Sequence, residues 1–318
     1  MALNSELILT LQNVKGIGAK SVLEIAELFG DRVQDIDDLC QYWGTLKKKK
    51  YEKVTTDDLA DAHRIALKII DQSEDNHIGI ISYYDSIFPQ LLRDCIDEEG
   101  KAAPPVLLFY RGNIKALEKP GVAVIGTREP TSNGVKAGIY FSRELAKKGF
   151  NIVSGLAIGC DTTGHQGALE AGGITTAFLA NGLDWESIYP KENLQLAKAI
   201  VENNGLLLSE YPIGQTCNRY ALVARDRLQA GLSYATVAIQ TGVNGGTMHA
   251  VKATLAAQKP LFMVNYKNEV DLREDKVQGN IEYIKSQKAH PLGTSTLESS
   301  IAIIEKEIEM RNKRRTLF

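Results

Sequence analysis

The pattern of apolar and polar positions divides the chain into three stretches. Residues 1–77 carry apolar side chains at spacings of three and four, as in Val22, Ile25, Ala26 and Phe29, and this spacing predicts helices. From residue 121 onward, short apolar runs alternate with helical stretches, which predicts βαβ units and a parallel sheet. The last 25 or so residues predict one amphipathic helix with a basic end.

These patterns predict three units and the class of fold. We expect an N-terminal helical domain over 1–77, a Rossmann-like α/β core with a doubly wound parallel sheet over 78–290, and a C-terminal amphipathic helix with a basic tail over 291–318. The expected strands are 122–125, 152–153, 175–179, 206–208, 236–239 and 261–264, and the helices between them include 135–148, 194–202 and 247–258.

Charge and cysteine content exclude several classes of protein. Lys and Arg number 37 against 39 Asp and Glu, a net charge of −2, so any nucleic-acid site must be a local patch. The four cysteines lie far apart, which argues against a zinc site and a disulfide framework and favours the cytoplasm. The chain has no uninterrupted apolar run of membrane-spanning length and no signal peptide at its start, so we expect no membrane contact.

Several loops that follow predicted strands combine glycine with hydroxyl or basic side chains. In a parallel sheet the carboxyl ends of the strands meet at one edge, where ligands bind, and the N–H groups of a helix start can hold a phosphate there. No G-x-G-x-x-G follows the first strand, so no cofactor is expected, and we also expect no metal. The candidate phosphate-binding residues are Gly126, Thr127, Arg128, Ser154, Gly155, Gly159, Asp161, His165, Lys191, Arg225, Arg227, Asn244, Gly245, Gly246 and Thr247.

Some of these candidates have an alternative interpretation. His165 is a phosphate contact, a general base or a buried helix histidine, and Lys191 is part of an anion site or an ordinary surface lysine. Arg225 and Arg227 stand two residues apart and do not share a helical face well. They either bracket a DNA strand or pair with Asp226 and Glu210.

A second glycine motif lies in the helical N-terminal stretch. In Lys15-Gly16-Ile17-Gly18, two glycines surround one apolar residue just before a helix, so backbone N–H groups can face a phosphate. This motif resembles a helix-hairpin-helix element, which predicts a secondary DNA-backbone contact through Lys15, Gly16 and Gly18; a plain connecting turn is the alternative. The four lysines at 47–50 predict a solvated surface, with a DNA contact as the minority alternative.

The order of motifs over residues 80–290 resembles that of the DprA/Smf DNA-processing family. The resemblance implies a non-enzymatic Rossmann-like core that binds single-stranded DNA without strong sequence preference, dimerises, and passes the strand to the RecA recombinase during natural transformation. It also implies that Arg128, the 154–159 loop, Arg225 and Arg227 line the DNA site. The motifs that carry the resemblance are Asp85-x-x-Phe88-Pro89, Ala103-Pro104-Pro105, Gly126-Thr127-Arg128, Ser154-Gly155-Leu156-Ala157-x-Gly159-x-Asp161, His165, Tyr189-Pro190, Ser209-Glu210-Tyr211-Pro212, Arg225-x-Arg227 and Ala230-Gly231-Leu232-Ser233.

One departure from the family pattern and one rival function bear on the site. Asp226 stands where the family has asparagine, which puts a carboxylate beside the expected phosphate contacts. The rival is a nucleotide-binding or nucleotide-processing enzyme or sensor, because Gly245-Gly246-Thr247 resembles the loop of the lysine-decarboxylase-like phosphoribohydrolases. Those enzymes place a glutamate three residues after the threonine, where this chain has Ala250, so an acid/base pair is missing there. A third possibility is a protein-interaction module that has lost DNA binding.

Overall fold

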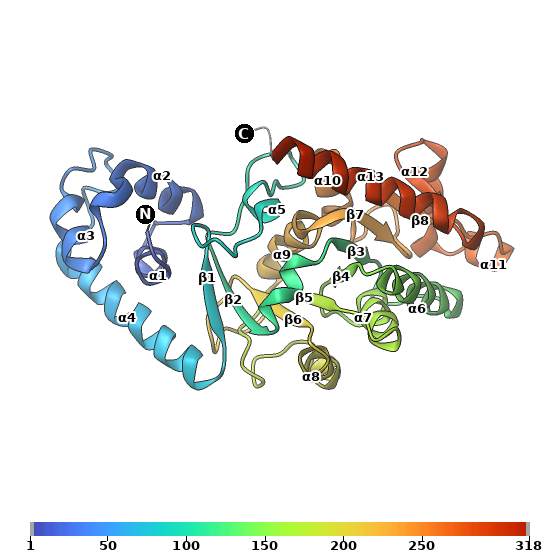
Figure 1. The fold of residues 1–318 in the computed structure, drawn as a ribbon, viewed down its shortest axis with the longest axis horizontal. Helices are drawn as coiled ribbons and strands as arrows, with labels where there is room; N and C mark the ends of the chain where they lie inside the picture. The colour runs from blue at the N-terminus through green and yellow to red at the C-terminus, as the bar shows by residue number, and fades with distance from the viewer. Residues whose placement is uncertain (1–2, 316–318) are drawn as a thin grey trace.

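Four helices open the chain and share a core with the sheet that follows. The computed structural model describes residues 3–315 (Figure 1). The first helices are α1 (Ser5–Asn13), α2 (Ala19–Phe29), α3 (Ile36–Trp43) and α4 (Thr56–Asp75). The side chains of Asn4, Asp35 and Thr55 cap α1, α3 and α4 by accepting amide hydrogen bonds at the helix starts. The apolar faces of these helices bury one cluster that continues to Leu107 and Phe109 of the sheet, so the two parts pack as one body.

Within the described residues, nine strands form one sheet in the order β1-β2-β6-β5-β4-β3-β7-β8-β9. The strands from β3 to β9 pair in parallel, which confirms the predicted parallel sheet, and β1 and β2 add an antiparallel edge. The strands are β1 (Gly79–Ser82), β2 (Leu107–Gly112), β3 (Gly121–Ile125), β4 (Asn151–Ser154), β5 (Thr175–Leu179), β6 (Leu206–Ser209), β7 (Ser233–Ala238), β8 (Leu261–Val264) and β9 (His290–Leu292).

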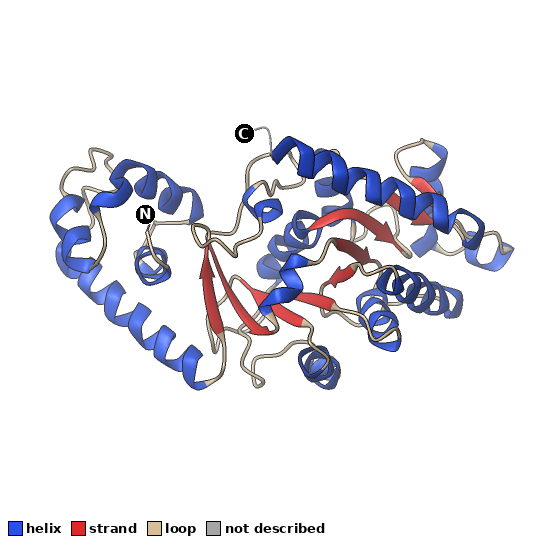
Figure 2. Cartoon of the chain, viewed as in Figure 1, coloured by secondary structure: helices blue, strands red, loops and turns tan. Residues whose placement is uncertain are grey.

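Helices cover both faces of the sheet, as the alternating pattern predicted (Figure 2). On one face lie α6 (Ser132–Lys147), α7 (Cys160–Glu170), α8 (Leu194–Glu202) and α13 (Leu297–Arg315). On the other lie α5 (Gln90–Arg93), α9 (Arg219–Leu232), α10 (Met248–Ala256) and α12 (Gln278–Lys285), and the short α11 (Glu269–Leu272) follows β8. With both faces covered, the central strands β3 to β8 are buried along their length, which explains their apolar runs.

The point where the sheet reverses its winding fixes the position of the site. From β3 the chain adds β4, β5 and β6 on one side and then returns to place β7 on the other side of β3. The loops after β3 and β7 therefore leave the sheet in different directions. In open α/β sheets a crevice forms between such loops, outside the carboxyl ends of the strands.

The sheet extends to both ends of the expected core. β1 and β2, near its start, form the antiparallel edge of the sheet. β9 crosses the expected boundary at 290, and α13 packs Leu297 and Ile301 against the central strands. The division into domains at 77 and 290 stays a prediction. Over residues 3–315, every helix is too short or too polar to cross a membrane.

Candidate nucleic-acid interface

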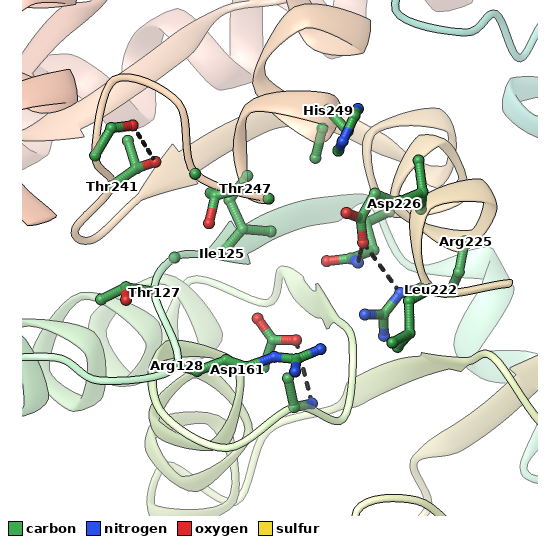
Figure 3. A pocket seen from close by; sticks show the side chains of 18 of the residues that line it. Ile125, Thr127, Arg128, Asp161, Leu222, Arg225, Asp226, Thr241, Thr247 and His249 are labelled. Carbon is green, nitrogen blue, oxygen red and sulfur yellow. Dashed lines mark hydrogen bonds and ion pairs between the residues drawn. The ribbon is translucent and has the colours of Figure 1, made fainter. Parts of the chain in front are cut away.

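A cavity of about 450 Å³ opens at the switch point between β3 and β7 (Figure 3). Its walls come from the loops after β3, β4 and β7 and from the side of α9, so the three glycine-rich loops do meet at one edge of the sheet. Eight predicted residues line it: Gly126, Thr127, Arg128, Asp161, Arg225, Gly245, Gly246 and Thr247.

The loop after β3 is held by its backbone, and this leaves Arg128 free. The amide of Thr127 donates to the carbonyl of Gln240 (2.8 Å), and the Thr127 carbonyl accepts from the amide of Cys160 (3.0 Å). A Cβ at Gly126 would lie 2.5 Å from Cys160 Sγ, so glycine is needed for this close approach. The Arg128 side chain is exposed and has no hydrogen bond or ion pair with the described residues, so its guanidinium can bind an incoming phosphate.

The loop after β4 brings Asp161 under the cavity and packs against the loop after β3. Gly159 has φ +86°, and a Cβ there would lie 2.5 Å from the carbonyl oxygens of Thr127 and Arg128. Gly155 leaves room for two buried side chains, because a Cβ at this position would meet Arg225 Nη1 at 2.0 Å and Asp161 Oδ2 at 2.4 Å. The glycines of this loop therefore shape the site by letting other groups come close.

Helix α9 supplies a buried arginine and a carboxylate beside it. The Arg225 side chain is only 7% exposed, and its Nη1 donates to the carbonyl of Phe178 (2.7 Å). Its Nε donates to Asp226 Oδ1 (3.2 Å), and Gln229 Nε2 donates to the same oxygen (3.1 Å). Arg225 therefore has a fixed position, with part of its charge already balanced by Asp226.

Burial shifts the pKa of both carboxyls in the cavity upward. Burial raises the pKa of Asp226 to about 6, against the lowering effect of the Arg225 charge. Burial likewise raises the pKa of Asp161, again opposed by Arg225. Three arginines, at positions 128, 219 and 225, line the cavity together with the two carboxyls of Asp161 and Asp226, so basic groups outnumber acidic ones locally despite the net charge of the chain.

The loop after β7 closes the cavity on its third side. The backbone N–H groups of Gly246 and Thr247 precede α10 and have no acceptor among residues 3–315, so they can donate to a ligand. His249, in the first turn of α10, also lines the cavity, and its Nδ1 lies 3.0 Å from Glu98 Oε2. Asn244, a predicted contact, belongs to this loop but does not line the cavity.

His165 and Ser154 support the site from below and have no access to it. His165 is fully buried; its Nε2 donates to the Gly155 carbonyl, and its Nδ1 lies 2.7 Å from Thr175 Oγ1. Burial lowers the pKa of His165 to about 4, so the ring is neutral and carries no charge for a phosphate. Ser154 Oγ donates to the Val124 carbonyl (2.6 Å) and ties β4 to β3. The structural interpretation of His165 therefore fits its surroundings.

Two predicted basic contacts lie outside the cavity. Arg227 forms a two-pronged ion pair with Glu210, with N–O distances of 2.9 and 2.7 Å, and its Nε donates to the Ala103 carbonyl (2.9 Å). Lys191 donates to the Glu186 carbonyl, and it lies next to a smaller cavity of about 150 Å³ without lining it. This smaller cavity shares Arg128 and Arg225 with the main one.

The N-terminal glycine motif forms a hairpin between α1 and α2. Gly16 has φ +87°, the amide of Ile17 donates to the Val14 carbonyl (3.1 Å), and the Ile17 side chain is buried. Gly18 occupies the position before α2 without a side-chain cap, and Lys15 is exposed. This geometry has the form of the predicted helix-hairpin-helix element. A contact of Lys15, Gly16 and Gly18 with DNA stays a prediction.

Sequence reasoning missed most of the α9 wall. The cavity is also lined by Arg219, Leu222, Val223 and Gln229 of α9, by Thr241 and Gly242 of the third loop, and by His249 of α10. Positions 219, 222, 223 and 226 follow the three-four spacing of one helical face. A helix predicted through 219–232 would have placed Arg219 on the same face as Asp226, two turns before it.

The fold and the site define a Rossmann-like α/β protein with an arginine-lined crevice at the switch point of its sheet. Residues 79–301 match the model of the DNA recombination-mediator protein A family, which is most of the chain, so the chain belongs to this family. This confirms the resemblance to DprA/Smf that the sequence motifs indicated.

Individual relatives agree with this assignment. The chain is 37% identical to Protein Smf of Synechocystis sp. over 194 residues, which are 60% of this chain and 46% of that protein. The fold is similar to that of DNA processing protein A (DprA) from Streptococcus pneumoniae, with TM-score 0.70, 24% identity and coverage of 93% of this chain and 95% of that one. DNA processing protein A from Helicobacter pylori gives TM-score 0.60 at 28% identity, covering 72% and 96%. The chain spans about half the length of the relatives matched by sequence.

Proposed function

We propose that the chain binds single-stranded DNA in the cavity between the β3, β4 and β7 loops and α9. The observation that carries this proposal is the pair of exposed arginines, Arg128 and Arg219, which face the cavity and have no partner among residues 3–315. They line the same cavity as Gly246 and Thr247, so a bound strand can meet both guanidinium and amide donors. The related protein from Helicobacter pylori binds single-stranded DNA, which supports this choice of ligand.

The direct test measures binding of a fluorescent oligo-dT strand by anisotropy across a salt series. We expect binding that weakens steeply with salt, because phosphate contacts release counterions. Arg128→Ala removes one charge-assisted contact and is expected to weaken binding about tenfold or more, and to lower the salt slope by about 0.7. Arg64→Ala, which removes an exposed arginine of α4, is the matched control and should bind as the wild type does. If the wild type does not bind at micromolar protein and low salt, the proposal is wrong.

The alternative of a nucleotide-processing enzyme lacks its expected catalytic glutamate, because an apolar residue occupies that position. Ala250 lines the cavity at the position where the lysine-decarboxylase-like enzymes have their glutamate, and His165 is buried beneath the β4 loop. The groups that remain are the two arginine-facing carboxyls and His249 beside Glu98. Thermal stabilisation by a mononucleotide, without stabilisation by an oligonucleotide, would contradict DNA binding and favour this alternative.

The partners and location belong to the same proposal. The family resemblance implies a cytoplasmic homodimer that transfers the bound strand to RecA, and we include both partners on that basis. Light scattering of the purified chain tests the dimer. Loading of RecA onto a strand coated with a single-strand-binding protein, with and without this chain, tests the transfer.

A further inference from the structure

The first two turns of α9 carry an aromatic side chain beside the cavity that the binding site does not yet use. Tyr220 is 88% exposed, more than any other large apolar side chain in residues 3–315. Exposing an aromatic ring of this size to water is unfavourable, because burial of its apolar surface would stabilise the protein. An exposed ring next to a cavity lined by arginines is the combination found where proteins bind single strands.

Helix geometry places Tyr220 at the rim of the cavity. Val223, one turn further on and 40% exposed, lines the cavity, and residues three apart on a helix are neighbours. Arg219, directly before Tyr220, lines the cavity too. Asn218 fixes the start of the helix, because its side chain accepts from the amide of Ala221 (2.9 Å). The ring and the guanidinium therefore stand on a helix start that is already ordered.

We propose that Tyr220 and Arg219 form an outer subsite in which the tyrosine stacks on a nucleobase of the bound strand and the arginine contacts the adjoining phosphate. This inference rests on the proposed binding of single-stranded DNA. Tyr220 and Val223 are three residues apart, a rise of about 4.5 Å along α9, so a single strand on the ring can continue past Val223 into the cavity. An aromatic face stacks on any base and a cation holds its phosphate, which is the combination that single-strand binding requires.

The chemistry of the rim favours a nucleotide over an apolar protein partner. The exposed apolar surface here is small, consisting of Tyr220 and Val223, and it is bordered by Arg219 and by Asp226. A stable protein interface needs a larger area with an apolar centre. One ring beside one free guanidinium matches the size and the alternating apolar and charged character of a nucleotide.

The test compares Tyr220→Ala and Tyr220→Phe with the wild type on oligo-dT and on a strand of the same length made of abasic units. We expect Tyr220→Ala to weaken oligo-dT binding about fivefold or more, and Tyr220→Phe to keep most of the affinity, because stacking needs the ring and not the hydroxyl. On the abasic strand the wild type and Tyr220→Ala should bind alike. Arg219→Ala should lower the salt slope by about 0.7 on both strands. Leu28→Ala, an exposed apolar change on α2, is the control.

Three results would overturn the inference. The first is unchanged oligo-dT binding by Tyr220→Ala. The second is an equal loss on oligo-dT and on the abasic strand, which would mean that Tyr220 does not contact a base. The third is a lower molar mass for Tyr220→Ala than for the wild type in light scattering, which would assign Tyr220 to an interface between copies of the chain. Absence of wild-type binding to either strand would instead remove the proposed function, and this inference with it.

Discussion

Asp226 is the residue at which this cavity departs from the family pattern, and its surroundings give the departure a physical consequence. The carboxyl is 16% exposed, lies 3.2 Å from the Nε of Arg225, and shares the cavity with Arg128 and Asp161. His249 of α10, itself beside Glu98 and Lys252, faces the same space. When Asp226 is ionised, it competes with a phosphate for Arg225. When it is protonated, this competition ends.

DNA affinity should therefore depend on pH through Asp226. Because the pKa of Asp226 is raised to about 6, we expect affinity to rise as the pH falls through about 6. Asp226→Asn should bind more tightly than the wild type at pH 7.5, by roughly fivefold for about 1 kcal/mol of removed repulsion, and should show less pH dependence. Anisotropy titrations from pH 5 to pH 8 measure both effects.

Two further measurements separate Asp226 from its neighbours. His249 lines the same cavity, so His249→Gln is measured over the same pH range and should retain the part of the pH dependence that belongs to Asp226. The raised pKa of Asp226 also makes the free energy of unfolding depend on pH. Its folded pKa is raised above 3.8, so its contribution favours the folded state at low pH and declines as the pH rises through about 6. Equal pH profiles for the wild type and Asp226→Asn would contradict the role given to Asp226.

At the scale of elements, the contact between the β4–α7 loop and α9 depends on the missing side chain of Gly155. Any Cβ there would overlap Arg225 Nη1 and Asp161 Oδ2, both of which are buried and held by other contacts. We expect Gly155→Ala to displace Arg225, weaken oligo-dT binding, and destabilise the fold by about 1–3 kcal/mol.

Gly44 provides a control that separates the steric overlap at Gly155 from the general effect of replacing a glycine by alanine. Gly44 has φ −62°, and a Cβ there would have no heavy atom within 4 Å, so Gly44→Ala should leave DNA binding and the melting temperature almost unchanged. Melting curves and anisotropy on both variants provide the comparison. If Gly155→Ala binds and melts as the wild type does, the close packing at this loop is not required.

The same elements explain which parts of the fold could be predicted. The buried strands of the parallel sheet are apolar throughout and alternate with helices, so their pattern was clear. β9 could not be found, because it has three residues including a proline, and two of them are exposed. Helix α9 was missed because its arginines and aspartate obscure the apolar spacing. The opposite orientations of Arg225 and Arg227 follow from their two-residue separation once the helix is known.

At the scale of the whole molecule, the two regions predicted to contact DNA lie far apart. Figure 1 places α2, and with it the hairpin before it, on the β1 side of the sheet, whereas the cavity lies at β3 and β7. In the sheet, β2, β6, β5 and β4 lie between β1 and β3. At the usual strand spacing, β1 and β3 are therefore roughly 24 Å apart. A short strand held in the cavity therefore cannot reach the hairpin, but a long one can.

This separation makes the secondary contact testable by strand length. Lys15→Glu reverses an exposed charge beside Gly16, and we expect it to weaken binding of a long oligo-dT severalfold while leaving a strand that just fills the cavity unaffected. Lys285→Glu, on α12, reverses another exposed lysine with the same change in net charge and should affect neither strand. Arg128→Ala should weaken the binding of both the short and the long strand, because Arg128 lines the cavity. Equal losses on short and long strands for Lys15→Glu and Lys285→Glu would indicate a general charge effect, and the hairpin would then be a connecting turn.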